Sequence, residues 1–376
     1  MVFLLAILLR SKGKGGIIIA MKISRSLNQE IISRYDASNL GAYEDTLANK
    51  LIESALKVSS LYSLSREKSY FQTDSIGFAI KKILGKEKFE GAHIDCLDPK
   101  LVLENPCFKA YRELGEFKEG DFKFCWLKYR KGEIFVAKEK KIEGIYDREE
   151  LGYLDEEVLF PAVLDKDVPW MSIIPHEIFT MARPIEEAKG KVATYGLGLG
   201  YYAFMVSEKE EVEEVYVIEN DAEAIRLFKK HLLPCFPHKE KIHIIEGDAL
   251  DENALEKLGT KIDFVFADLY HNADDALPIY AKLLKNEIPG VVYSYWIEDS
   301  ILLYFRRALS SYLYEQAIEE FGDAAYQSEE TYDDLVLKAL HKAMKGQRVE
   351  TKKELEPLFS KEVCKEICRK LKFSLQ

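Results

Sequence analysis

Short apolar runs alternate with longer amphipathic segments through the second half of the chain. Five of these runs, rich in Val, Ile, Tyr and Phe, have the length and composition of buried strands. They are KVATY ending at Tyr195, EVYVIE ending at Glu219, KIHIIE ending at Glu246, DFVFAD ending at Asp268, and GVVYSYWI beginning at Gly290. Helical spacing of apolar residues separates them, as in DAEAIRLFKKHLL and DALPIYAKLLKN. The alternation predicts an α/β fold, a Rossmann-like, open, mostly parallel sheet with helices on both faces.

Other patterns flank this region. Helical spacing runs from Asn39 through Lys57 and recurs around IGFAIKKIL from Ile76. Further on the period shortens, and FKFCWLKY and EIFVAKEKKI are expected as strands joined at Arg130 to Gly132, either in a β-rich subdomain or as a hairpin pair. After Asp299 the pattern is almost wholly helical. The predicted units are a helical region over 21–90, a small β-rich subdomain over 91–168, the Rossmann-like domain over 169–300 and a helical region over 301–376.

The chain begins with the apolar stretch MVFLLAILLR. It is apolar for only nine residues before Arg10, whereas a helix needs roughly 20 to cross a bilayer. No basic leader precedes it, as a signal peptide would require. We therefore expect no membrane span, and expect residues 1–20 to be an extension before an alternative start at Met21.

Composition narrows the classes of function. Acidic residues outnumber basic ones, 64 to 53, for a formal charge of −11, which argues against indiscriminate nucleic-acid binding unless basic residues cluster locally. The six cysteines include no CxxC pair, which favours a reducing, cytoplasmic setting. Cys364 and Cys368 lie one helical turn apart and are expected as buried thiols, so no metal site is predicted.

Candidate chemistry gathers at the ends of the predicted strands. Gly196, Gly198 and Gly200 directly follow the first of these strands, and glycine lets a backbone turn sharply and approach a ligand closely. Glu219 ends the next strand, nineteen residues past Gly200. A carboxylate at that place can accept both hydroxyl protons of a ribose. Asp248 follows the third strand, so polar groups recur where an open parallel sheet binds ligands.

These segments resemble the motifs of class I S-adenosylmethionine-dependent methyltransferases over roughly Pro169 to Trp296. YGLGLGYYAF is similar to the first motif, VIEND to the second, EGDAL to the third and DFVFADLY to the fourth. The resemblance implies S-adenosylmethionine as cofactor, with the glycines beneath its methionine part, Glu219 on the ribose, Asn220 beside the adenine, and Asp248 with Ala249 at the adenine's edge. The implied cofactor-binding residues are Tyr195, Gly196, Gly198, Gly200, Glu219, Asn220, Asp248, Ala249 and Asp268.

The chain departs from that family in two places. The family has an acidic residue two places before the first glycine, where this chain has Thr194; Glu177, in PHEIFTM before the first strand, is a candidate substitute. The family also closes its sheet with an antiparallel hairpin, whereas the pattern after Asp299 is helical. The sheet is then either truncated or completed by short runs.

Three other functions remain open. Aminopropyltransferases of the spermidine-synthase type resemble DFVFAD, but their glycine loop carries an aspartate that GLGLG lacks. GLGYYA, from Gly198 to Ala203, fits the dinucleotide fingerprint of an NAD-dependent oxidoreductase, which needs a second nucleotide-binding half. A non-catalytic cofactor-binding protein would use the same fold.

The methyl acceptor is not predicted beyond its class, with a small molecule or a protein favoured over nucleic acid. Asp268, Tyr270 and His271 follow the fourth strand and are the candidate catalytic residues, His271 as a general base or as a solvated loop residue. Asp274 and Asp275 are expected to cap the next helix. Aromatic side chains of the fifth strand line the acceptor pocket or are buried; they are Tyr293, Tyr295 and Trp296. The terminal helical regions would cover the pocket or join the subunits of a homo-oligomer.

Overall fold

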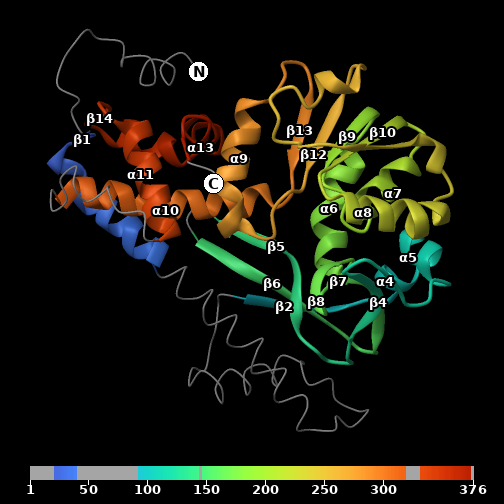
Figure 1. Ribbon diagram of the computed structural model, residues 1–376. Coiled ribbons are helices and arrows are strands. Elements are labelled where there is room, and N and C mark those ends of the chain that lie inside the picture. Colours follow the sequence, from blue (N-terminus) through green and yellow to red (C-terminus); the bar gives the residue numbers. More distant parts are fainter. Residues whose placement is uncertain (1–20, 40–91, 144–145, 319–330, 374–376) are drawn as a thin grey trace.

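The computed structural model describes residues 21–39, 92–143, 146–318 and 331–373 (Figure 1). The predicted extension over 1–20 and the helical patterns from Asn39 to Lys57 and around Ile76 lie outside these ranges, apart from Asn39 itself. Described residues 28–39 are helical, after the short strand β1 (Lys22–Ile23).

A five-stranded parallel sheet forms the centre of the molecule (Figure 1). Its strands are β9 (Gly190–Tyr195), β10 (Val212–Glu219), β11 (Ile242–Glu246), β12 (Phe264–Ala267) and β13 (Val292–Tyr295). They correspond to the five predicted apolar runs, in the order β11-β10-β9-β12-β13. The order reverses between β9 and β12, which is where an open α/β sheet opens a crevice for ligands.

Helices cover both faces of this sheet. Tyr202 of α7 (Tyr201–Ser207) stacks on Phe266 of β12 with ring centroids 4.1 Å apart. Tyr280 of α9 (Ala273–Lys285) meets Tyr295 of β13 at 4.9 Å. Phe266 is in register with Ser294, the neighbour of Tyr295, and successive side chains of a strand point to opposite faces. The two helices therefore pack on opposite faces, and the predicted fold class is confirmed.

Helix α6 (Pro175–Glu187) precedes the sheet and packs against α7. It begins with Pro175, whose fixed φ and missing N–H suit the first turn of a helix. Trp296, just past β13, donates its indole N–H to the Thr180 hydroxyl of α6 at 2.9 Å. The amino-terminal half of α6 is thereby held near the carboxyl end of β13.

Two small sheets precede α6. The first holds β2 (Ala92–Leu97), β6 (Tyr146–Leu154) and β5 (Phe135–Glu143), in the order β2-β6-β5. The second holds β3 (Phe117–Glu119), β4 (Phe122–Tyr129), β7 (Val158–Asp165) and β8 (Val168–Ser172), in that order. The short helices α4 (Lys100–Leu103) and α5 (Pro106–Tyr111) lie between β2 and β3.

The expected hairpin of β4 with β5 is wrong, although both strands form. β4 pairs with β7 and β5 with β6, so the chain changes sheets at Arg130 to Gly132. Gly132 donates its N–H to the carbonyl of Leu154, at the end of β6, at 2.8 Å. The turn is thus bonded to a distant strand rather than closing a local ladder.

The region after β13 is helical, as expected, with one short strand. Its elements are α10 (Glu298–Ile318), α11 (Tyr332–Met344), β14 (Arg348–Val349), α12 (Lys352–Leu355) and α13 (Lys361–Cys368). Helix α8 (Ala222–Leu227) lies earlier in the chain, between β10 and β11. β14 pairs in parallel with β1, away from the central sheet. Cys364 and Cys368 are buried on α13. Within the described ranges no strand extends the sheet beyond β13, and no helix is long and apolar enough to cross a membrane.

Candidate functional site

The glycine loop turns sharply where β9 ends. Gly196 has φ +95°, in the left-handed region that a residue with a side chain rarely adopts. A Cβ at this position would overlap the backbone carbonyl oxygen of Asp268. Gly200 is also left-handed, at φ +76°, and packs against the ring of Phe228. Only glycine lets the loop lie this close to the end of β12.

Glu219 fastens the loop to the end of β10. One carboxylate oxygen accepts the backbone N–H of Leu197 at 3.0 Å, and the other accepts those of Asn220 and Asp221, each at 2.8 Å. The side chain predicted to hold a ribose is thus oriented before any ligand arrives.

A cleft of about 410 Å³ opens beside the loop, at the carboxyl ends of β9 to β12, a size typical of small-molecule sites. It brings together most of the predicted site residues. Those on its lining are Gly196, Gly198, Glu219, Asn220, Asp248, Ala249, Asp268, Tyr270 and His271. Tyr195 is buried at the end of β9. Gly200 ends the loop at the start of α7 and packs against Phe228, away from the cleft lining. The wall formed by Trp170 and Met171 of β8 was not predicted, because no spacing rule links them to the glycine motif.

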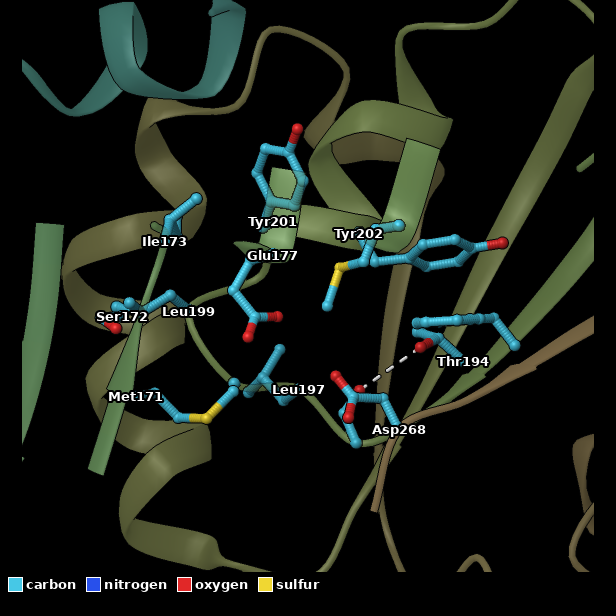
Figure 2. Close-up of a pocket in the computed structure, with 14 residues that line it drawn as sticks. Met171, Ser172, Ile173, Glu177, Thr194, Leu197, Leu199, Tyr201, Tyr202 and Asp268 are labelled. Atoms are coloured by element: carbon cyan, nitrogen blue, oxygen red, sulfur yellow. Dashed lines mark hydrogen bonds between the residues drawn. The ribbon is translucent and has the colours of Figure 1, made fainter. Parts of the chain in front are cut away.

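A smaller cavity of about 30 Å³, room for about one water molecule, adjoins the loop (Figure 2). Glu177 enters it from the first turn of α6, and Asp268 from the end of β12. Thr194, where the resembled family has an acid, is buried and donates its hydroxyl to the carbonyl of Gly196 at 3.4 Å. Glu177, the candidate substitute, therefore lines the same cavity as Thr194.

The pKa of the Asp268 carboxyl group is strongly shifted by its surroundings. Burial raises its pKa well above the usual range, and the neighbouring Glu177 carboxylate raises it further. Among the described residues none donates a hydrogen bond to its side chain. Asp268 borders both the cleft and the smaller cavity, so a ligand that occupies either one meets this group.

Tyr270 and His271 take different positions. Tyr270 is buried, and its hydroxyl donates to the carbonyl of Trp296 at 2.6 Å; burial raises its pKa well above the usual value. His271 has a side chain 77% exposed, with Nδ1 3.2 Å from a carboxylate oxygen of Asp275. Tyr270 anchors the segment after β12, whereas His271 is exposed and contacts Asp275.

The residues after His271 start helix α9 earlier than expected. α9 begins at Ala273, so Asp274 and Asp275 lie inside its first turn rather than at the capping position before it, although Asp275 still takes part in the cap. Asn272 takes that position, since its side chain accepts the N–H of Asp275 at 3.2 Å. Asp275 in turn accepts the N–H of Asn272 at 3.0 Å, which closes a reciprocal cap.

The aromatic residues of the fifth strand serve packing. The Tyr295 hydroxyl donates to Glu287 at 2.8 Å, and that of Tyr293 accepts the N–H of Ile288 at 3.1 Å. Trp296 is buried against α6. Among the described residues that line the cleft, these three are absent.

Sheet order and site together define a class of protein: a Rossmann-like α/β protein with a ligand cleft at the point where the strand order reverses. No protein-family model matches the chain, and no curated protein is similar to it.

Two solved structures show a partial likeness. A putative O-methyltransferase from Klebsiella pneumoniae is 20% identical, over 38% of this chain and 64% of that one, with a TM-score of 0.24. Trm5b from Pyrococcus abyssi is 17% identical, over 41% and 46%, with a TM-score of 0.25. The chain thus spans less than two thirds of the length of either protein. Such TM-scores add nothing to what the sheet order shows.

Proposed function

We propose that this protein binds S-adenosylmethionine in the 410 Å³ cleft and transfers its methyl group to an acceptor. One observation carries the proposal. Glu219, Asp248 and Asp268, which follow three different strands, border one cleft together with Gly196 and Gly198. A ribose, an adenine and a charged amino-acid end require this combination of carboxylates and close-lying backbone.

The residues of the cleft have chemistry that fits the parts of that cofactor. Glu219 faces the ribose hydroxyls, while Asn220, Asp248 and Ala249 border the adenine. Glu177 replaces the missing acid at Thr194 and receives the ammonium group in the smaller cavity. That cavity supports the assignment because two carboxyl groups, Glu177 and Asp268, meet there with no Lys or Arg among its described lining residues.

The bound cofactor supplies an electrophilic methyl group, and the protein aligns the acceptor and removes a proton where one must leave. Asp268 is the proposed proton acceptor, because it borders both cavities and its raised pKa makes its carboxylate a stronger base than an ordinary aspartate. Tyr270 acts as a positioning residue, since its phenol is hydrogen-bonded to Trp296. His271 is exposed, and it assists only if the acceptor reaches the rim of the cleft.

Thermal unfolding with a panel of ligands tests the proposal. S-adenosylmethionine and S-adenosylhomocysteine should raise the melting temperature, because a ligand at 100 times its Kd adds about 2.7 kcal/mol to the free energy of unfolding. Decarboxylated S-adenosylmethionine tests the aminopropyltransferase function, and NAD tests the dehydrogenase. A clear response to NAD with none to the sulfonium compounds would overturn the proposal. Binding without turnover of any acceptor would indicate a non-catalytic protein.

Glu219→Ala checks the ribose assignment. The variant should lose at least about tenfold in affinity for S-adenosylhomocysteine, since about 1.4 kcal/mol is tenfold and each charged hydrogen bond is worth about that or more. It should also melt somewhat lower, because three loop amides lose their acceptor. Glu156→Ala, an exposed residue between β6 and β7, is the control and should change neither quantity. Unchanged affinity in Glu219→Ala would remove the assignment.

A further inference from the structure

The cleft and the smaller cavity carry charge of one sign. Their lining includes the carboxyl groups of five residues, which are Glu177, Glu219, Asp221, Asp248 and Asp268. Among the described residues of both linings there is no Lys and no Arg, and His271 is mostly exposed. A low-dielectric cleft lined by one sign of charge attracts ligands of the other sign. An acceptor carrying phosphates or carboxylates would find no cationic partner on these walls.

Most of these carboxylates already accept hydrogen bonds from the protein. Glu219 accepts three amides, as described above. Asp221 caps α8 through the N–H groups of Glu223 and Ala224 at 2.7 and 3.1 Å. Asp248 accepts the N–H of Leu250 at 2.8 Å. These three groups are therefore stabilised without any ligand.

Asp268 differs from them. Asp268 is half-buried and borders the two cavities, and within the described chain no group donates a hydrogen bond to its side chain. A largely desolvated carboxylate without a donor from the protein is stabilised when it meets a cationic partner. The proposed function gives the ammonium group of the cofactor to Glu177 in the smaller cavity, so on the cleft side the partner that stabilises Asp268 is a positively charged N–H donor of the acceptor.

An aromatic side chain of β8 lines the same cleft. Trp170 lies on its lining and is held by stacking on Phe122, with ring centroids 4.6 Å apart. The face of an indole attracts ammonium groups. The wall of the cleft that contains Trp170 therefore suits a positively charged amine, as Asp268 does.

We propose that the methyl acceptor is a cationic amine whose nitrogen binds at Asp268, in the cleft that Trp170 walls. The inference rests on the proposed function and names the substrate class of that site. The ammonium first loses a proton to the Asp268 carboxylate, which passes it to solvent. The free nitrogen pair then forms a bond to the methyl carbon while the carbon–sulfur bond breaks and its electron pair stays on sulfur. The products are an N-methylammonium ion and a neutral thioether.

Titration calorimetry with length-matched compounds tests the inference. The probes are 1,4-diaminobutane, 1,4-butanediol and succinate, with their three- and five-carbon analogues, each titrated with and without saturating S-adenosylhomocysteine. At least one diamine should bind at least tenfold more tightly than the diol and the diacid of its length. Asp268→Asn should abolish that preference, whereas Asp155→Asn, which removes an exposed carboxylate outside the cleft, should leave it intact.

The outcomes separate this inference from the proposed function. Binding of S-adenosylhomocysteine without any preference for amines overturns the amine acceptor and leaves the proposed function standing. An Asp268-dependent preference for amines without binding of S-adenosylhomocysteine keeps the amine site and overturns methyl transfer. A melting temperature of Asp268→Asn at or above that of the wild type shows that its loss of binding is not a loss of folding.

Discussion

At the scale of single residues, Gly196 sets how closely the loop approaches β12. An alanine there has to adopt a left-handed backbone, at about 1–2 kcal/mol, and its Cβ meets the Asp268 carbonyl. We expect Gly196→Ala to lower the free energy of unfolding by about 3 kcal/mol or more, measured by denaturant titration. Gly259→Ala is the matched control, since Gly259 is also left-handed but has no described atom within 4 Å of its added Cβ. It should lose only about 1–2 kcal/mol, and equal losses would refute the close approach.

Asp268 should reduce the stability of the ligand-free protein. Its pKa is raised on folding, so the folded state binds the proton more tightly and stability falls as pH rises from the unfolded pKa toward the folded one. Asp268→Asn does not titrate, and the variant should therefore melt higher than the wild type at neutral pH. The difference should shrink toward zero below about pH 4, the usual range for aspartate. Thermal melts across pH check this, and a variant that melts lower at neutral pH would argue against an uncompensated buried carboxyl.

Sequence predicts site residues well where strand ends and motif spacing define them. Gly196, Glu219 and Asp248 each follow a strand, so a parallel sheet brings them to one edge. The bond from the Leu197 amide to Glu219 was not predictable, because it depends on the path of the glycine loop. Trp170 was missed for another reason: it comes from a strand of the preceding sheet, and no periodic pattern links that strand to the cleft.

At the scale of elements, local pattern identifies strands better than their partners. β4 and β5 were expected from alternation and adjacent position, but each pairs with a strand further along the chain. Alternation says which face of a strand is apolar, and it says nothing of which other strand completes the ladder. The βαβ region escapes this difficulty, because right-handed crossovers restrict how parallel strands can neighbour one another.

Glu298 joins three helices of the carboxyl-terminal region. From the start of α10 it accepts the Tyr280 hydroxyl of α9 at 2.7 Å and meets Lys361 and Lys365 of α13 at 2.8 and 2.7 Å. Burial alone would raise the pKa of Glu298, but the two ammonium groups bring it below the usual value. The stability that this group contributes is therefore present above the unfolded glutamate pKa and is lost as pH falls through the folded one.

We expect Glu298→Gln to lower the free energy of unfolding by about 1–3 kcal/mol at neutral pH. Denaturant titrations at several pH values should show the deficit shrinking below about pH 4. Asp299→Asn is the control: that side chain is 52% exposed and also meets Lys361, at 2.8 Å. An exposed pair is worth about 0–1 kcal/mol. A deficit in Glu298→Gln that does not change with pH would contradict the ion-pair account.

At the scale of the whole molecule, the net charge of −11 argues only against a polyanionic partner and does not locate a binding site. The folded chain adds that the cleft itself is acidic, with five carboxyl groups on the described linings and no Lys or Arg there. These carboxyl groups lie together because α6, the glycine loop and the end of β12 meet in the fold. No single stretch of the sequence contains all three segments, so the acidic cleft could not be predicted from sequence patterns.

The central claim is that the cleft at the end of β9 binds S-adenosylmethionine. Titration calorimetry of the purified chain with S-adenosylhomocysteine tests it most directly. We expect one molecule bound per chain, with affinity reduced at least about tenfold in Glu219→Ala and unchanged in Glu156→Ala. Absence of binding by the wild type, or binding that Glu219→Ala leaves unchanged, would contradict the account.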